Sequence, residues 1–283
     1  GLNMGQKFIQ KIKLLYTDAG ARVHTGGMVS EKFLLERGTR QGCPLSLLLF
    51  ALAMEPVANV LRRRLKGWGI QIGDTVHTLS LYADDALVYV RQPQYSVPIL
   101  LKSMKEFGDI SGLYVNPSKS ELFPTGKLEG VPVSQLPVVG LPWVTTNIRY
   151  LGIWVTRTAE ESLAMNIGRV VEGLRPTIEF WNTLPLSLMG RVALTKMVLL
   201  PRCLYVLQGS QYEIPRRMFV IIGKLMMKLM WAGKRNKVRL DTLKQTWSAG
   251  GMEVPDLETY YIAAQLQHAV QWLDQGKLGK KID

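Results

Sequence analysis

The chain has 283 residues, 47% of them hydrophobic, which is enough to bury one large core or two ordinary ones. Its 35 basic and 22 acidic residues give a net charge of +13. This charge favours a polyanionic partner, nucleic acid before a membrane, over the alternative of a basic protein with a solvated lysine surface. Two cysteines, and three histidines without metal-ligand spacing, argue against a disulfide scaffold and a zinc site.

The sequence has no pattern typical of a membrane span or a secretory signal. Its best apolar run, 45–54, is too short to cross a bilayer, and no basic-then-apolar leader opens the chain. We therefore expect no membrane partner. The low cysteine content favours a reducing compartment, so we expect an intracellular protein, in the nucleus or the cytoplasm. Because the sequence opens on Gly1 rather than Met, we expect a fragment of a longer chain.

Hydrophobic periodicity and turn signals predict a mixed α/β part at the beginning of the chain. The helices are expected to end at capping residues and the strands at turns. In chain order we expect a helix over 6–17, a hairpin within 21–38 that turns at Gly26-Gly27, a helix over 47–67 capped by Ser46 and kinked at Pro56, strands over 76–83 and 86–90, and a helix over 98–111 capped by Gly112.

The character of the sequence changes in its second half. Proline-rich residues 124–148 predict a loop, and 149–156 predicts a strand. Beyond Thr158 the pattern is helical, and helix-start signals occur at suitable positions. The expected helices are 160–182, 187–206 starting at Ser187, 215–231 starting at Pro215, and 256–275 starting at Asp256.

Two adjacent carboxylates, Asp84 and Asp85, lie between two β-prone runs in 81-LYADDALVYV-90. We expect a hairpin whose tip carries both acids. Like charges this close repel unless a cation neutralises them, and Mg²⁺ takes oxygen ligands while keeping positions open for phosphate. Paired metal ions held by acids are the usual device for attack of a hydroxyl on a phosphate. The alternative is an ordinary turn, because Asp is a common turn residue.

A glycine-containing segment, 38-GTRQGCPLS-46, follows a strand signal and precedes a helix. Its glycines allow close approach of the backbone to a flat ligand. Gln41 offers a donor and an acceptor, and Arg40 offers a fork of donors. Such a loop is suited to cradle a base pair as it forms. The alternative is a connector whose glycines only turn the chain.

Two further features are basic. Lys119, within 111-SGLYVNPSKSEL-122, has the chemistry to protonate or neutralise a leaving pyrophosphate, although a lone lysine near a turn is more often a solvated charge. The segment 224-KLMMKLMWAGKRNKVRL-240 predicts a basic helical strip beside Trp231 that suits a nucleic-acid backbone, the alternative being a solvated face. Its cations are Lys224, Lys228, Lys234, Arg235, Lys237 and Arg239.

Several segments, in this order, carry a resemblance to one family. They are 37-RGTRQGCPLSLLLFALAMEP-56, 81-LYADDALVYV-90, 111-SGLYVNPSKSEL-122 and 150-YLGIWVT-156, followed by helical segments at 189–205, 229–240 and 250–261. With these residues the chain resembles a reverse transcriptase from a LINE-type (non-LTR) retrotransposon over nearly its whole length.

The resemblance implies an α+β, right-hand polymerase fold. Residues 1–158 would hold part of the fingers and a palm with an antiparallel sheet, and residues 159–283 a helical thumb and post-thumb region. It also implies RNA-directed DNA polymerase (nucleotidyltransferase) activity. In that reaction the hydroxyl of a DNA primer attacks the α-phosphate of a deoxynucleotide on an RNA template, with Mg²⁺ or Mn²⁺ as cofactor.

Roles follow from the resemblance for the residues that match the family's motifs. Asp84 and Asp85 match the catalytic, metal-binding pair, and Lys119 matches the candidate general acid. Gln41 and Gly42, with their neighbour Arg40, match the loop beneath the incoming nucleotide. Tyr82 and Ala83 match the positions beside the primer end. The hairpin that grips the primer is matched by Tyr150, Leu151 and Gly152.

One departure from the family bears on activity. The family's catalytic centre needs a third carboxylate, on a strand before the glycine-containing loop, and no matching segment occurs here; Asp18 does not match it. We therefore expect a truncated polymerase domain that is inactive by itself, and whose two-metal site forms only if a third carboxylate is supplied. The alternatives are a catalytically silent, retrotransposon-derived nucleic-acid-binding module and a relic whose unpaired strand edges favour aggregation.

Overall fold

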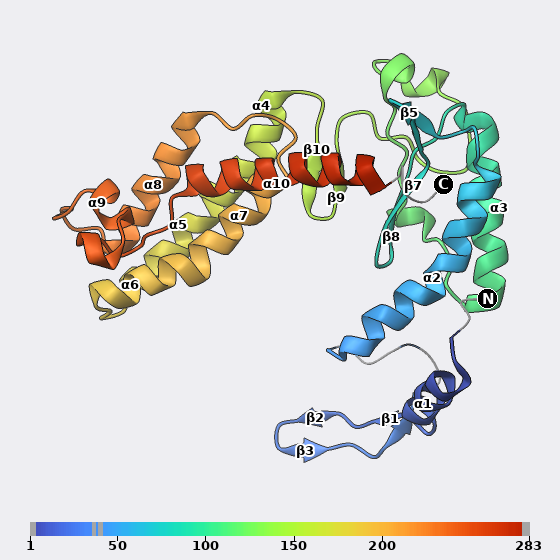
Figure 1. Ribbon diagram of the computed structural model, residues 1–283, viewed down its shortest axis with the longest axis horizontal. Coiled ribbons are helices and arrows are strands. Elements are labelled where there is room, and N and C mark those ends of the chain that lie inside the picture. Colours follow the sequence, from blue (N-terminus) through green and yellow to red (C-terminus); the bar gives the residue numbers. More distant parts are fainter. Residues whose placement is uncertain (1–3, 36–37, 39–41, 279–283) are drawn as a thin grey trace. The chain divides into compact units, whose positions relative to one another are not determined.

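Figure 1 shows the computed structural model, which describes residues 4–35, Gly38 and 42–278. The chain divides into two compact units. The first runs through Val115 and includes Pro137–Gly140, and the second consists of Asn116–Leu136 and the chain from Leu141 onward. The first unit contains helices and short strands, and the second is mainly helical.

The helix and the hairpin predicted at the beginning of the chain are both present. Helix α1 spans Gln6–Tyr16 and buries none of its residues. The hairpin turns at Gly26-Gly27, and its strands form two antiparallel pairs: β1 (Gly20–Ala21) with β4 (Phe33–Leu34), and β2 (His24–Thr25) with β3 (Met28–Val29).

The core of the first unit forms where two helices cover one face of a hairpin. Helices α2 (Pro44–Arg64) and α3 (Pro93–Ser111) run side by side, and the hairpin of β7 (Leu79–Tyr82) and β8 (Asp85–Val88) lies against them (Figure 1). The buried side chains Met54, Val57, Leu61 and Leu65 contact partly buried neighbours from α3 and from both strands, including Leu79, Val88, Ile99, Met104 and Phe107. Because a two-stranded hairpin alone is marginal in water, this contact is what stabilises it.

Helix α2 differs in its start from the predicted one. It begins at Pro44 with Cys43 as its N-cap, and Ser46 lies inside the helix and is buried, so the predicted cap at Ser46 is wrong. The physical reason is that proline at the first helical position has a preset φ and needs no donor. The helix continues through Pro56. By length and composition alone α2 is able to cross a membrane; within the first unit it contacts α3 and β7.

The described strands pair as separate two-stranded ribbons, so the antiparallel pairing is confirmed while the single palm sheet is not. The predicted strand 76–83 is divided at Thr78, because β6 (Thr75–His77) pairs with β5 (Ile70–Ile72) whereas β7 pairs with β8. Thr78 is buried at this break, and its carbonyl accepts a hydrogen bond from the Tyr89 N–H at 2.9 Å.

The predicted strand 149–156 is wrong, because the chain reverses within it. Strands β9 (Ile148–Tyr150) and β10 (Ile153–Val155) pair antiparallel across a two-residue turn. Leu151 and Gly152 form this turn with φ of 47° and 80°. Positive φ at both central residues is the geometry that matches the twist of a tight hairpin. The hairpin that the resemblance implied is therefore present.

Arg157, just after this hairpin, holds the proline-rich loop. Its guanidinium donates to the carbonyls of Thr145 and Pro124, each at 2.8 Å, and forms an ion pair with Glu129 at 3.1 Å. It also lies 4.5 Å from the ring centroid of Phe123. The prediction of a loop is confirmed. The loop contains two short 3₁₀ turns, η2 (Gly126–Leu128) and η3 (Val133–Gln135), and a third, η1 (Pro117–Lys119), precedes it.

The helices of the second unit agree with the four predicted ones, with one short addition. Ser187 caps the second of them by accepting a hydrogen bond from the Gly190 N–H at 3.2 Å, as expected. The missed helix, α9, is too short to show a periodic pattern. The elements are α4 (Ala159–Ser162), the π-helical η4 (Leu163–Gly168) and α5 (Arg169–Asn182); α6 (Leu188–Leu194), the π-helical η5 (Thr195–Leu199) and α7 (Leu200–Gln208); α8 (Arg216–Met230); α9 (Leu240–Lys244); the 3₁₀ turn η6 (Trp247–Ala249); and α10 (Leu257–Leu278).

The core of the second unit lies between α5, α7 and α8 and extends to Ile153 of the hairpin. Leu174, Ile178, Leu207 and Leu229 are completely buried in it. Cys203 is also buried there, and desolvation raises the pKa of its thiol to about 12. Since the thiolate is the nucleophile and metal ligand, this cysteine has a packing role.

A buried arginine joins the end of α5, the α5–α6 connection and the end of α8. Arg191 is only 5% exposed, and its guanidinium donates to Asn182 Oδ1 at 2.8 Å. It also donates to the carbonyls of Leu184, Leu186 and Leu229 at 3.0, 3.2 and 3.1 Å. These acceptors belong to the end of α5, to the connection between α5 and α6, and to the end of α8.

Replacing this arginine tests how much the clamp contributes to stability. Arg191→Met keeps an apolar stem but leaves the four acceptors without their donor, so we expect a loss of about 3 kcal/mol in the free energy of unfolding. Urea denaturation measures the loss. The matched control is Arg202→Met, an exposed arginine of α7, for which a change below about 1 kcal/mol is expected. Equal effects of the two changes would contradict the clamp.

The hairpin turn generates a second prediction. Gly152→Ala places a Cβ at a φ of 80°, which we expect to cost about 1–2 kcal/mol of stability. The matched control is Gly173→Ala in the interior of α5, where a Cβ meets nothing within 4 Å. There the same change is expected to stabilise by up to about 1 kcal/mol, because alanine favours a helix. Thermal unfolding of both variants gives opposite signs if the turn is as described; a stable Gly152→Ala variant argues against it.

Candidate functional site

The acidic pair lies at a hairpin tip, but the turn is one residue earlier than predicted. Tyr82 and Asp85 are the last paired residues, so Ala83 and Asp84 form the turn and Asp85 already belongs to β8. Ala83 has a φ of 51°, a left-handed conformation that is uncommon for a residue with a side chain. Its expected place in the strand is therefore wrong. Asp84 lies within this tight turn and Asp85 directly follows it.

Burial along the hairpin shows which face is open. Leu79 and Leu81 are partly buried towards the helices, while Ser80 and Tyr82 are exposed, as the predicted alternation requires. Directly paired residues share a face, so Asp85 lies on the side of Tyr82. Both Asp84 and Asp85 are exposed. The hairpin thus presents its carboxylates to solvent on the face that the helices leave uncovered.

These carboxylates offer only some of the ligands that a metal site needs. Their oxygens are the ligands that Mg²⁺ and Mn²⁺ prefer. Across the described residues, however, no group of three His, Cys, Asp or Glu side chains is close enough to hold an ion. The donor set in this part of the chain therefore falls short of what a pair of ions needs.

The glycine-containing loop leads directly into α2. Gly42 has a φ of 81°, and a Cβ there would meet nothing within 4 Å, so glycine is required by the backbone and not by crowding. Arg40 and Gln41 lie outside the described residues. The turning role of the glycine is thus observed, and the role of the loop beneath a nucleotide stays a prediction.

Lys119 lies in η1, an exposed 3₁₀ turn that Asn116 caps by accepting hydrogen bonds from Ser118. It belongs to the second unit, whereas Asp84 and Asp85 belong to the first. Its side chain is exposed, which fits the solvated lysine as well as the general acid. Its role with pyrophosphate therefore stays a prediction.

The turn of the β9–β10 hairpin is seated on α7. The hydroxyl of Tyr205 donates a hydrogen bond to the Leu151 carbonyl, and the Gly152 backbone passes beside the same ring. Ile153 lies in the core next to Gly209, where any side chain would collide with it. Leu151 and Gly152 are therefore held in place by helix contacts, as a primer-gripping element would need to be.

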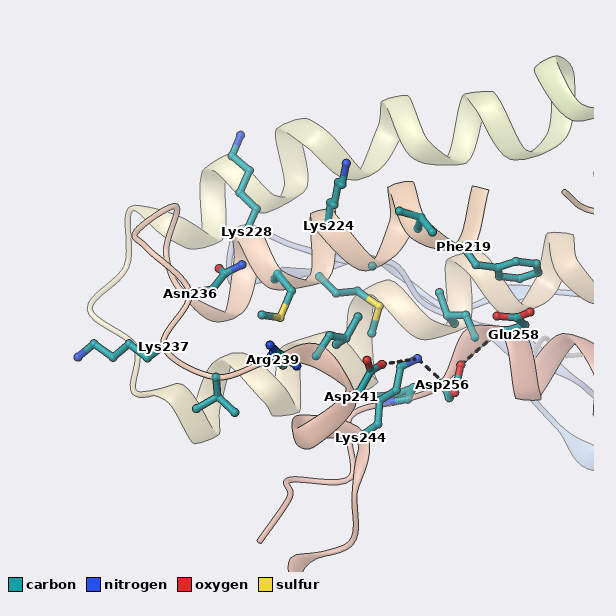
Figure 2. A pocket seen from close by; sticks show the side chains of 18 of the residues that line it. Phe219, Lys224, Lys228, Asn236, Lys237, Arg239, Asp241, Lys244, Asp256 and Glu258 are labelled. Atoms are coloured by element: carbon teal, nitrogen blue, oxygen red, sulfur yellow. Dashed lines mark hydrogen bonds and ion pairs between the residues drawn. The ribbon is translucent and has the colours of Figure 1, made fainter. Parts of the chain in front are cut away.

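The basic strip surrounds a groove and is helical only in part. Helix α8 ends at Met230, so Lys224 and Lys228 lie on the helix while the other four cations lie on the segment before α9. The prediction of one helical strip is wrong because the chain leaves the helix after Met230. Trp231 caps the helix, and Ala232 has a positive φ of 52°. The groove has a volume of about 740 Å³, and Figure 2 shows Lys224, Lys228, Lys237 and Arg239 around it. Arg235 is not among its lining residues.

Charge is unevenly distributed around this groove. At the α9–α10 side, Lys244 pairs with Asp241 and Asp256 at 3.8 and 3.2 Å (Figure 2), and Arg216 lies 3.9 Å from Glu258. At the α8 side, Lys228 lies 3.5 Å from Glu179. Within the part of the chain that the structure describes, the other five cations of the strip have no carboxylate within 4.0 Å. The loop side of the groove is therefore its positive side.

Trp231 does not present an aromatic ring to nucleic acid beside the basic strip, as its position in the sequence suggested. Its ring packs against the core of the second unit, and its indole N–H is buried without an acceptor among the described residues. Such a ring is not available for stacking on a base. The exposed arginines that do lie over an aromatic ring are Arg149 and Arg169, both near Trp154. We did not predict these three residues; the hairpin register places Arg149 opposite Trp154, and no sequence signal indicates Arg169.

Comparison with known proteins supports these features as those of one family. The family model described as reverse transcriptase (RNA-dependent DNA polymerase) matches residues 4–155. A Xenopus laevis protein, "Transposon TX1 uncharacterized 149 kDa protein", is 28% identical over 238 residues, which is 82% of this chain and 18% of that protein. A Drosophila melanogaster protein, "Retrovirus-related Pol polyprotein from type-2 retrotransposable element R2DM", is 28% identical over 211 residues, 69% of this chain and 18% of that protein.

The chain thus spans less than a fifth of the length of either relative. The family match covers more than half of the chain, including the glycine-containing loop, the acidic hairpin and the whole β9–β10 hairpin. Both relatives are named for transposable elements. The chain therefore belongs to the reverse transcriptase (RNA-dependent DNA polymerase) family and is a LINE-type, non-LTR member of it.

Proposed function

We propose that this chain is the palm and thumb portion of a retrotransposon reverse transcriptase, which copies RNA into DNA when its catalytic centre is complete. The observation that carries the proposal is the exposed acidic pair at the tip of the β7–β8 hairpin. Its position is held by α2 and α3, and it lies within the family match. In this role residues 1–158 contribute the palm and part of the fingers, and 159–283 contribute the thumb and the post-thumb region.

Each part of the site has a proposed task. Asp84 and Asp85 supply oxygen ligands for Mg²⁺ or Mn²⁺, the group that would neutralise charge on the reacting phosphates. Tyr82 and Ala83 lie beside the primer end, and the turn of Tyr150, Leu151 and Gly152 holds the primer strand. Arg40, Gln41 and Gly42 contact the incoming deoxynucleotide, and Lys119 is the general acid for pyrophosphate.

Asp84 and Asp85 alone do not complete the catalytic centre. A metal pair needs more donors than two neighbouring carboxylates provide, and the described residues contain no third acid beside them. We propose that a further carboxylate, from sequence beyond the present 283 residues, completes the centre. The chain by itself then binds nucleic acid and incorporates no nucleotide.

A primer-extension assay tests this limit. With an RNA template, a DNA primer and Mg²⁺ or Mn²⁺, we expect no incorporation by this chain above that of the Asp84→Ala, Asp85→Ala variant. The loss of a charge-stabilising contact costs orders of magnitude in rate. A longer polypeptide that adds the preceding strand is expected to extend the primer, and to lose that activity on the same double substitution. Incorporation by the short chain that the double variant abolishes would show that another of its own acids completes the site.

The second candidate function, a silent nucleic-acid-binding module, is favoured by the groove between α8, the loop before α9 and the start of α10. Its loop side carries cations without carboxylate partners among the described residues, and a phosphate backbone is the polyanion that such a surface suits. This binding needs neither a metal ion nor the acidic hairpin. It is compatible with the polymerase, whose thumb would use the same groove.

A binding assay tests the groove. We expect Lys234→Gln, Lys237→Gln to weaken binding of an RNA–DNA duplex and to lower the slope of log affinity against log salt by about 1–2, because up to two phosphate contacts are lost. The matched control is Lys102→Gln, Lys105→Gln, two exposed lysines of α3 with the same change in charge. Asp84→Ala is expected to leave the affinity nearly unchanged. Equal weakening by both lysine pairs would mean that only the net charge matters.

A further inference from the structure

Two exposed arginines stack near one tryptophan on the β9–β10 hairpin. The guanidinium carbon of Arg169, at the start of α5, lies 4.9 Å from the ring centroid of Trp154, and that of Arg149 lies 6.0 Å from it. Arg149 is the cross-strand partner of Trp154, so both lie on the same face of the hairpin. The other face, with Ile153, is buried in the core.

The backbone of Trp154 is anchored by a buried side chain. The side chain of Asn166, which is 6% exposed, accepts a hydrogen bond from the backbone N–H of Trp154 at 2.9 Å and donates one to the backbone carbonyl of Trp154 at 3.0 Å. Asn166 also donates to Ser162 Oγ at 3.3 Å. These contacts pair an edge of β10 with the π-helical turn η4, and that turn leads directly into Arg169. The π-helical turn therefore holds the backbone of Trp154 close to the second arginine.

The two arginines have no carboxylate partner among the described residues. Neither has a carboxylate within 4.0 Å among the described residues, whereas other ordered arginines such as Arg62, Arg64 and Arg157 do. A guanidinium stacked on an aromatic face keeps its N–H edge free for a planar, bidentate anion such as a phosphate. Preorganised arginines lose less conformational entropy when they bind.

We propose that Arg149 and Arg169, oriented by Trp154, form a clamp for two phosphates of a nucleic-acid strand. The ligand is the phosphodiester backbone, not the bases, because guanidinium groups suit phosphate oxygens and the Arg169 guanidinium already lies over the Trp154 ring. The clamp is distinct from the groove beside α8, and none of its three residues lines that groove. The inference rests on the proposed function, because it requires that the chain binds nucleic acid. It adds a second contact with the strand to the β9–β10 hairpin, whose turn is assigned to the primer.

The test measures binding of two fluorescent single-stranded DNA probes across a salt series, one with bases and one abasic. Arg149→Gln, Arg169→Gln is expected to weaken binding of both probes about tenfold and to lower the salt slope by about 2. Arg169→Lys, which keeps the charge and loses the stacked fork, is expected to recover only part of the affinity. The control is Arg175→Gln, an exposed arginine on another side of α5, with a change below about twofold.

The outcomes separate the clamp from the function on which it rests. A double variant no weaker than the control overturns the clamp, and if the Lys234→Gln, Lys237→Gln variant is still weakened, nucleic-acid binding by the groove stands. A loss seen only on the probe with bases overturns the backbone assignment in favour of stacking. Full affinity in Arg169→Lys overturns the role of the guanidinium. If the unsubstituted chain binds neither probe nor the RNA–DNA duplex, both the clamp and the proposed binding function fail. Circular dichroism of each variant checks that the fold is retained.

Discussion

Burial of one face of the β7–β8 hairpin and of the β9–β10 hairpin is the constraint on which the rest of this structure depends. A two-stranded ribbon has too little hydrophobic surface to be stable alone in water, so its position is decided by the helix beneath it. The β7–β8 hairpin is held through Leu79 and Val88 against α2 and α3, and the β9–β10 hairpin through Ile153 against α7. The face that remains open is then fixed by these helices, and in both hairpins it carries charged residues.

The two open faces have opposite charge. One presents the carboxylates of Asp84 and Asp85, which suit a divalent cation, and the other presents Arg149 beside Arg169, which suit phosphate. A polymerase needs both, because its metal ions must meet the reacting phosphates while the strand itself is held elsewhere. The basic groove beside α8 provides a further positive surface in the helical unit. The net charge of +13 is thus partly gathered into sites where carboxylate partners are missing among the described residues.

Polar side chains inside the helical unit serve to connect its elements. Arg191 and Asn166 are both nearly buried, and each satisfies backbone groups that helix and strand ends leave free. Such groups are costly when unpaired, so these contacts specify which ends lie together. Cys203 is buried in the same core and Trp231 packs against it, and both contribute packing rather than connections of this kind.

The local elements, the acidic hairpin and the family were predictable from the amino-acid sequence, because periodicity, capping residues and short motifs are local properties of the chain. The sequence located the four long helices of the second unit and the turn at Gly26-Gly27 closely. It misplaced the breaks at Thr78 and Leu151-Gly152 and the start of α2, because pairing partners and the buried face compete with propensity there. Other features became visible in the folded structure alone. The strands form separate ribbons, and Trp231 packs against the core. Arg149 and Arg169 lie near Trp154. Those contacts depend on how the elements pack together, and no local pattern encodes which side chains a helix will cover.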